Sequence, residues 1–166
     1  MAKKQQVVYL LLGGNLHDVK HTFELARIQL EKLVGDVIQV SHLYKSKAWG
    51  FESDNEFLNQ VIVLRSYLTA EELLLEIQKI ELDLGRHRTK GLKGFESRII
   101  DIDILYYNTD IISNSNLTIP HYALHQRNFT LEPLVEIAPN FMHPILKKSN
   151  QTLLEECADK SIVTKI

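Results

Sequence analysis

Two aspartates, Asp101 and Asp103, lie one residue apart in RIIDIDILYY, residues 98–107. The stretch is otherwise rich in Ile, Leu and Tyr, which predicts a buried β-strand. Because side chains alternate along a strand, both carboxylates share one face, with Cα atoms roughly 6.5 Å apart. Such a pair can converge on one hard cation such as Mg²⁺ or bridge two of them. A solvated sheet face with arginines as counter-ions is the alternative.

The segment before this strand is strongly basic. Residues 86–98 carry five cations and one carboxylate, namely Arg86, Arg88, Lys90, Lys93, Arg98 and Glu96. Arginine forks bind phosphate oxygens in bidentate fashion, so a polyphosphate with its Mg²⁺ suits a basic loop beside a carboxylate pair. Loops of this length are uncommon unless they are functional or disordered, and lids over active sites are one functional use. A mobile basic surface segment is the alternative interpretation.

Other nucleotide-binding motifs are missing from the sequence. It contains neither GxxxxGK[ST] nor GxGxxG, and Gly13-Gly14-Asn15 is interpreted as a tight turn. Any phosphate would therefore be bound by side chains and Mg²⁺. Further donors for a phosphate or an adenosine are His121, Tyr122 and Arg127. Three histidines without ligand-like spacing are interpreted as surface or loop residues: His87, His125 and His143.

Aromatic residues predict a second kind of site. Phe57 and Asn59 share a face of their strand, which puts an apolar ring beside an amide that can donate and accept hydrogen bonds. Phe129 lies in the polar stretch QRNFT. Two rings and an amide could hold a flat heterocycle and bind its hydrogen-bonding edge. Core phenylalanines with a turn asparagine are the alternative, and Trp49 is either a core residue or part of a loop over this pocket.

The predicted elements that position these residues follow the order β-α-β-β-α-β. The strands are expected at 6–12, 37–47, 57–66 and 98–107; one helix is expected between Asp18 and Gly35, and one between a Thr69 capping box and Gly85. This order predicts a ferredoxin-like α+β sandwich, with helices packed on one face of an antiparallel sheet. The last third is expected to elaborate this core, with short strands at 110–113 and 117–119 and a helix at 131–137.

Length and composition limit the possible classes. The 166 residues, 45% hydrophobic and 24% charged, predict one folded domain, residues 1–166, and disfavour disorder. A net charge of -2 gives no overall attraction to nucleic acid or to an anionic membrane, so we expect neither as a partner. The apolar run near the N-terminus is too short for a signal segment or a membrane span. With Cys157 as its one cysteine, the chain forms no internal disulfide, and a cytoplasmic location is expected.

Several motifs together resemble those of the 6-hydroxymethyl-7,8-dihydropterin pyrophosphokinase family. The most specific are SRIIDIDIL, LTIPHYALHQRNF and IQKIELDLGRHR, which occur in a likeness that runs through nearly the whole sequence. The resemblance implies transfer of diphosphate from MgATP to the hydroxymethyl group of a pterin, with release of AMP, in folate biosynthesis. ATP and the pterin are then the small-molecule partners.

The resemblance also implies residue roles. Asp101 and Asp103 would hold two Mg²⁺ ions, and Arg86 and Arg98 would stabilise charge on the phosphates. The implied nucleotide site comprises Gln78, Glu81, Arg86, Arg88, Arg98, Ile104, Thr118, His121, Tyr122 and Arg127. The implied pterin site comprises Ser46, Lys47, Trp49, Phe57, Asn59, Phe95 and Phe129. The sequence departs from the family's usual pattern at Lys47, at Phe57, at Asn116 and in the run 95–98.

Two rival functions are disfavoured by the sequence. An RNA-binding module of ferredoxin-like fold would carry a K/R-G-F/Y-G/A-F-V-x-F/Y strand and a basic sheet face, and neither is present. A metal-dependent phosphodiesterase or nuclease would normally add further carboxylate or histidine ligands to the aspartate pair.

Overall fold

The structure, a computed structural model, describes residues 3–47, 56–85 and 99–166. Its centre is an antiparallel sheet with the strand order β5-β1-β4-β3-β8, in which β2 also pairs with β4. The sheet strands are β1 (Gln6–Gly14), β2 (Gly35–Val40), β3 (Tyr44–Ser46), β4 (Phe57–Ser66), β5 (Asp101–Tyr107) and β8 (Val163–Lys165). The helices are α1 (Val19–Leu33), α2 (Ala70–Asp83), α3 (Asn128–Ile137) and α4 (Asn150–Glu156). Smaller elements are β6 (Ile112–Ser113), β7 (Thr118–Ile119) and the 3-10 helix η1 (Leu124–Gln126). The chain is an α+β protein, as predicted.

The first two helices begin where the sequence predicts. The Asp18 carboxylate accepts a hydrogen bond from the backbone N–H of His21 (3.2 Å), and the Thr69 hydroxyl accepts one from the N–H of Glu72 (3.1 Å). Each side chain satisfies a backbone donor that has no partner within its helix. After α2 the chain passes through Gly85 at φ +96°, a conformation that favours glycine.

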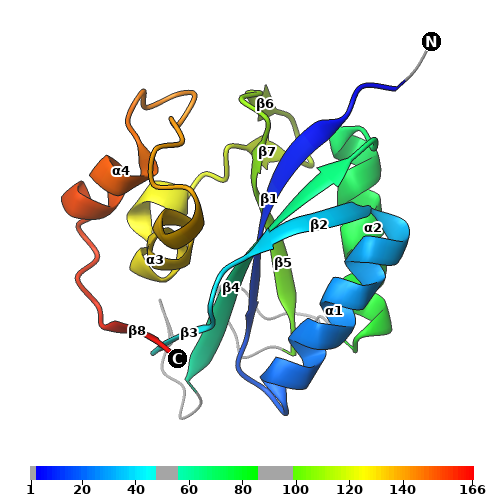
Figure 1. The fold of residues 1–166 in the computed structure, drawn as a ribbon, viewed down its shortest axis with the longest axis horizontal. Helices are drawn as coiled ribbons and strands as arrows, with labels where there is room; N and C mark the ends of the chain where they lie inside the picture. Colours follow the sequence, from blue (N-terminus) through cyan, green and yellow to red (C-terminus); the bar gives the residue numbers. More distant parts are fainter. Residues whose placement is uncertain (1–2, 48–55, 86–98) are drawn as a thin grey trace.

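One face of the sheet is closed by α1 and α2, as Figure 1 shows. Aliphatic side chains of β1, β4 and β5 meet both helices in a dry core. Its fully buried members include Leu10, Leu12, Leu30, Ile62, Leu64, Leu73, Ile77 and Ile80. Burial of each such side chain stabilises the fold by roughly 1.5–3 kcal/mol. We call this the core face.

The other face is covered by the last third of the chain. Here α3 and α4 pack on alternate residues of the same strands, such as Leu11, Val61 and Leu105. The prediction of helices on a single face therefore holds for α1 and α2 and misses α3 and α4 on the opposite side. Neither α4 nor β8 was predicted. We call this side the site face.

Two predicted boundaries are wrong for identifiable reasons. The strand expected at 37–47 is broken into β2 and β3, because the Ser41 hydroxyl between them accepts the hydrogen bond from the N–H of Val61 (2.9 Å). Gly13 and Gly14 do not form a tight turn but extend β1, paired with Asn59 and Leu58 of β4.

The strands and helix predicted in the last third also differ in extent. Their counterparts are the shorter β6 and β7 and the longer α3, which contains Pro133. No helix in the described parts of the chain is long and apolar enough to cross a membrane.

Candidate active site

Strand register brings the aspartates and the predicted pterin-binding amide into one row on the site face. Asp101 pairs with Gly13 across β5 and β1, and Gly13 pairs with Asn59 across β1 and β4. Directly paired residues of antiparallel strands project to the same face. Asp103 pairs in the same way with Leu11, which packs under the α3–α4 layer. Asp101, Gly13 and Asn59, which are more than 40 positions apart in sequence, thus lie side by side on the same face of the sheet.

Gly13 is the middle residue of this row, and its lack of a side chain shapes the site. A Cβ atom at position 13 would lie 2.8 Å from Nδ2 of Asn59. Asn59 is buried, and the same Nδ2 donates to the carbonyl oxygen of Leu12 (3.3 Å). The Asn59 amide therefore occupies space that a larger residue in β1 would take.

His121 lies beside the aspartates and is neutral at pH 7. Its Nε2 is 3.7 Å from Oδ2 of Asp103. Burial and the charge of Arg127 lower the pKa of His121 to about 4, against an opposing effect of Asp101. The Nδ1 atom accepts a hydrogen bond from the backbone N–H of Ala123 (3.2 Å). Because Nδ1 is an acceptor, the proton of the neutral ring is on Nε2, toward Asp103.

The donor set at the aspartates suits Mg²⁺ bound together with a substrate. Asp101 and Asp103 are both half-buried on one face of β5. Within residues 3–47, 56–85 and 99–166 there is no group of three or more His, Cys, Asp or Glu side chains that could hold a metal ion. Mg²⁺ is typically held by one or two carboxylates, with water and substrate phosphates as further ligands. The pair therefore fits Mg²⁺ that arrives with a polyphosphate.

Glu81 of α2 contacts the strand that carries the aspartates. Its side chain is buried, and its Oε2 accepts a hydrogen bond from the backbone N–H of Ile102 (3.0 Å), the residue between Asp101 and Asp103. Sequence reasoning linked Glu81 only to the nucleotide and missed this contact. The sequence carries no local signal of this contact, because the edge position of β5, which leaves backbone donors to be satisfied by side chains, is set by the folded sheet. Gln78, one turn earlier in α2, is exposed.

Arg127 joins the predicted nucleotide and pterin residues. Its guanidinium carbon lies 5.9 Å from the ring centroid of Tyr122 and 5.6 Å from that of Phe129, distances typical of cation–π contacts. The His121 ring stacks on Tyr122 with centroids 4.8 Å apart. Arg127 itself is buried, so these rings fix the position of its charge.

The strands β3 and β4 supply the other predicted pterin residues. Ser46 of β3 pairs with Phe57 of β4, and α3 contacts both strands. The Ser46 hydroxyl is buried and has no hydrogen-bond partner among the described residues. Phe129 of α3 packs against the apolar cluster of the site face, whereas Lys47 is exposed. A buried hydroxyl without a partner is costly in a folded protein and is readily explained by a ligand.

Some predicted residues are not brought into this group. The Ile104 side chain is buried in the cluster of the core face, and Thr118 is exposed on β7. Predicted residues outside the described ranges are Trp49, Arg86, Arg88, Phe95 and Arg98, together with the histidine His87. His143, interpreted as a surface or loop residue, lies in a loop but is buried at 3% exposure, and its Nδ1 accepts from the N–H groups of Ile145 and Leu146.

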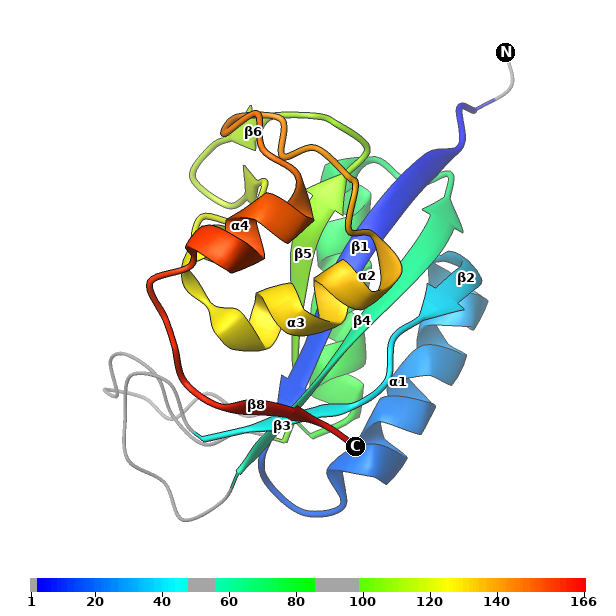
Figure 2. The ribbon, with the colours of Figure 1, turned by 60° about the vertical axis from the view of Figure 1, so that its left-hand side comes forward.

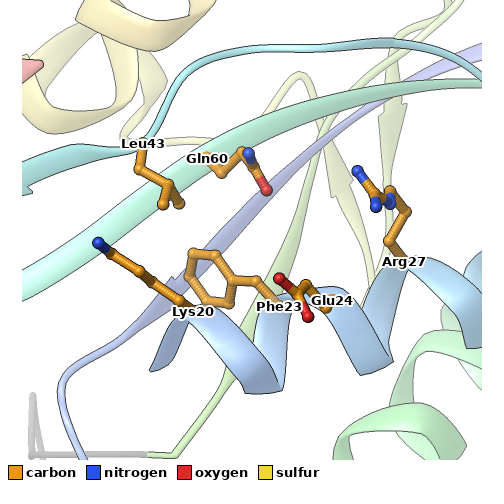
Figure 3. A pocket seen from close by; sticks show the side chains of 6 residues that line it. All are labelled: Lys20, Phe23, Glu24, Arg27, Leu43 and Gln60. Carbon is orange, nitrogen blue, oxygen red and sulfur yellow. The ribbon is translucent and has the colours of Figure 1, made fainter. Parts of the chain in front are cut away.

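A separate cavity lies on the core face, between α1 and the region where β2 gives way to β3 (Figure 3). Its lining residues are Lys20, Phe23, Glu24, Arg27, Leu43 and Gln60. Gln60 alternates with Asn59 along β4, so the sheet separates this cavity from the row of Asp101, Gly13 and Asn59. The cavity is therefore not part of the aspartate site.

A family model described as "7,8-dihydro-6-hydroxymethylpterin-pyrophosphokinase (HPPK)" matches residues 9–139. The chain belongs to this family. The match spans both aspartates, the row across the sheet and α3, and it ends before α4 and β8. Family membership and the named relatives support pyrophosphokinase activity in folate biosynthesis.

Individual HPPK relatives agree with the family match. A 2-amino-4-hydroxy-6-hydroxymethyldihydropteridine pyrophosphokinase of Aquifex aeolicus (strain VF5) is 42% identical over 85% of this chain and 86% of its own length. A protein of the same name from Porphyromonas gingivalis (strain ATCC 33277) is 38% identical over 83% of this chain and 94% of its own. A crystal structure of Plasmodium falciparum HPPK-DHPS with pteroate has the same fold, with a TM-score of 0.78 and 17% identity. The match covers 94% of this chain but only 45% of the Plasmodium chain.

Proposed function

We propose that this chain transfers a diphosphate group from MgATP to the hydroxymethyl oxygen of 6-hydroxymethyl-7,8-dihydropterin and releases AMP. The row of Asp101, Gly13 and Asn59 carries this proposal. It sets carboxylates suited to a Mg²⁺-bound polyphosphate beside an amide suited to the edge of a heterocycle. An active site for both substrates needs this proximity, because the alcohol must reach the β-phosphorus.

In the proposed nucleotide half, Asp101 and Asp103 hold Mg²⁺, and two ions are expected. Mg²⁺, when bound, neutralises negative charge on the phosphate groups and helps to align them. His121 is neutral and offers its Nε2 proton as a hydrogen-bond donor, and Arg127 supplies a fixed positive charge. The arginines of the preceding loop, Arg86, Arg88 and Arg98, bind phosphate oxygens. Gln78, Glu81, Ile104, Thr118 and Tyr122 complete the proposed nucleotide residues.

In the proposed pterin half, Phe57 and Phe129 stack on the two faces of the heterocycle. The Asn59 amide binds its hydrogen-bonding edge, and the Ser46 hydroxyl, which has no hydrogen-bond partner among the described residues, supplies a further contact. The remaining residues of the proposed pterin site are Lys47, Trp49 and Phe95.

The reaction requires an in-line displacement at the β-phosphorus. The bond from the pterin oxygen to the β-phosphorus forms while the bond from that phosphorus to the bridging oxygen of AMP breaks. The side chains contribute mainly by positioning the two substrates and by stabilising charge on the transferred group.

We also propose that residues 1–166 form one domain with a ferredoxin-like βαββαβ core. The position of β1 between β5 and β4, with β2 and β3 together on the far edge of β4, supports this proposal.

The test is AMP formation by the purified chain, followed by chromatography. We expect AMP from ATP only when Mg²⁺ and the pterin alcohol are both supplied, with a stoichiometric diphosphorylated pterin. AMP released at the same rate without the pterin would instead indicate a phosphodiesterase. Absence of AMP under all these conditions would also contradict the proposal.

A further inference from the structure

The chain continues beyond α4 in a tail, residues 157–166, that lies outside the residues matched by the family model. Figure 2 shows the tail running from α4 past α3 to β8, which lies beside β3. The tail thus passes two of the elements that carry proposed pterin-binding residues, with Phe129 on α3 and Ser46 on β3.

Residues of the tail cap the N-terminus of α3, because the N-cap residue of the helix does not do so itself. Arg127 occupies the N-cap position of α3 and makes no side-chain capping bond. Instead, the N–H of Asn128 donates to Oδ2 of Asp159 (3.0 Å), and Nδ2 of Asn128 donates to the carbonyl oxygen of Ser161 (2.9 Å). A carboxylate at this position satisfies a free backbone donor and interacts favourably with the positive end of the helix dipole.

Asp159 is itself held in place by its neighbours. Its Oδ1 accepts hydrogen bonds from the N–H (3.0 Å) and the hydroxyl (2.6 Å) of Ser161. Burial raises the pKa of Asp159, but the bonds from Ser161 and Asn128 outweigh burial and hold the pKa below its ordinary value. The Asp159 carboxylate that caps α3 is therefore negatively charged at neutral pH.

The same tail is fixed to β3 a few residues later. In the antiparallel pairing of β8 with β3, Val163 is opposite Ser46 and Lys165 is opposite Tyr44. One short segment thus contacts the residue before Phe129 and the strand that carries Ser46.

We propose that Asp159 is a positioning residue, and that the segment 159–165 is a strap that sets the spacing between α3 and β3 and thereby the affinity for the pterin. The inference rests on the proposed function. We expect a smaller effect on the affinity for ATP. Arg127, next to Asn128, is a proposed nucleotide residue beside the cap, but the aspartates and Glu81 belong to β5 and α2, which the strap does not pair with.

The experiment compares Asp159→Ala, Asp159→Asn and Ser161→Ala in the full chain. Glu155→Gln is the charge-matched control, an exposed carboxylate on neighbouring α4. For each variant, KM for the pterin alcohol, KM for ATP, kcat and the thermal midpoint are measured. Calorimetry then gives the Kd of the pterin in the presence of Mg²⁺ and a non-hydrolysable ATP analogue.

For Asp159→Ala we expect the KM and Kd of the pterin to rise about fivefold, the size of effect that loss of a helix cap produces. KM for ATP should rise less than KM for the pterin, because Arg127 lies beside the cap whereas the aspartates lie on β5. Asp159→Asn and Ser161→Ala should show smaller rises in the same direction, because each keeps an acceptor for the Asn128 N–H. Glu155→Gln should match the wild type.

Two outcomes would contradict the proposal that the strap sets the affinity for the pterin. One is a wild-type KM and Kd for the pterin in all three variants. The other is a loss that follows the thermal midpoint and affects both substrates equally, as a purely structural role predicts. If the wild type forms no AMP with ATP and the pterin alcohol, the proposed function fails instead, and the two failures are thereby distinguished.

Discussion

The two faces of the sheet are built from the same strands but serve different purposes. On the core face, apolar side chains and Tyr107 form the cluster under α1 and α2, and Glu81 of α2 is buried beside β5. On the site face, the same strands present Asp101, Asp103 and Asn59 beside an apolar cluster under α3 and α4. Alternation along a strand therefore allows β1, β4 and β5 to stabilise the fold with one set of residues and to bind substrates with the other.

Because the two faces carry different residues, the free energy of unfolding and the affinity for substrates should respond to different substitutions. A change at a core-face residue that is not proposed to bind the nucleotide should alter the free energy of unfolding and leave substrate affinity unchanged. A change in the row on the site face should do the reverse. Each of the following substitutions tests this separation.

The largest effect is expected at the aspartates. Asp101→Asn and Asp103→Asn should each lower the rate of AMP formation about 1,000-fold, because an amide is a poor Mg²⁺ ligand and leaves phosphate charge uncompensated. Asp110→Asn, at an exposed carboxylate just after β5, is the control and should keep the wild-type rate. Thermal midpoints of all three variants should stay close to the wild-type value. A near-normal rate in either aspartate variant would refute the metal assignment.

Next in size is a substitution on the core face. Leu73 of α2 is 0% exposed, and Leu73→Ala should lower the free energy of unfolding by about 3 kcal/mol through lost burial and a cavity. Urea denaturation measures this loss. Both KM values at 20 °C should remain those of the wild type. Leu75→Ala on the same helix, at an exposed side chain, should change the free energy of unfolding by less than about 0.5 kcal/mol. A changed KM in Leu73→Ala would show that the two faces are coupled.

A smaller effect is expected at Gly13 of β1, the middle residue of the row on the site face. Gly13→Ala would place a Cβ 2.8 Å from Nδ2 of Asn59 and displace that amide. The KM for the pterin should rise about tenfold, and the KM for ATP should change much less. In the background of Asn59→Ala, the same substitution should add little, because its partner in the clash is gone. Additive effects in the double variant would indicate a different cause.

The smallest effect expected is a loss of folding stability at acidic pH through protonation of His143. Burial and the charge of His125 lower the pKa of His143 to about 4, below the ordinary 6.5, so the folded protein binds a proton less readily than the unfolded chain. The contribution of this group to stability is therefore complete above pH 6.5 and is lost as the pH falls toward 4. His143→Asn keeps an acceptor for the N–H groups of Ile145 and Leu146 and does not titrate.

The measurement is urea denaturation at several pH values between 7 and 4.5, with hydrogen exchange of α3 and α1. We expect a shallower loss of stability in His143→Asn than in the wild type. In the wild type, protection should fall in α3 before α1. An identical pH dependence of the two proteins would contradict this assignment.

The core face was largely predictable from the sequence, because its signals are local. The apolar spacing of α1 and α2 and the caps at Asp18 and Thr69 lie within one or two turns of the residues that they order. The aspartate pair was predictable for the same reason, since alternation along one strand fixes its face.

The arrangement of α3, α4 and β8 over the site face was not predictable, because it depends on contacts between residues that are far apart in sequence. Asp159 caps a helix that begins 31 positions earlier, and β8 pairs with a strand more than 100 positions away. The burial of His143 and the break at Ser41 likewise depend on tertiary partners. For Asn59, sequence indicated the face but not the glycine that leaves room for its amide.

The contact between Glu81 and the N–H of Ile102 has a further consequence for the exposed side of the sheet. Among the described strands, β5 lies at one edge of the sheet, and an open strand edge can recruit a strand from another molecule and begin aggregation. The Glu81 carboxylate occupies one backbone donor of this edge, and the carbonyl of Leu105 accepts from the N–H of His121 further along. An incoming strand would have to displace both contacts and desolvate a buried carboxylate. The hydrogen bond between Glu81 and the strand that carries the aspartates thus also closes part of the β5 edge to an incoming strand.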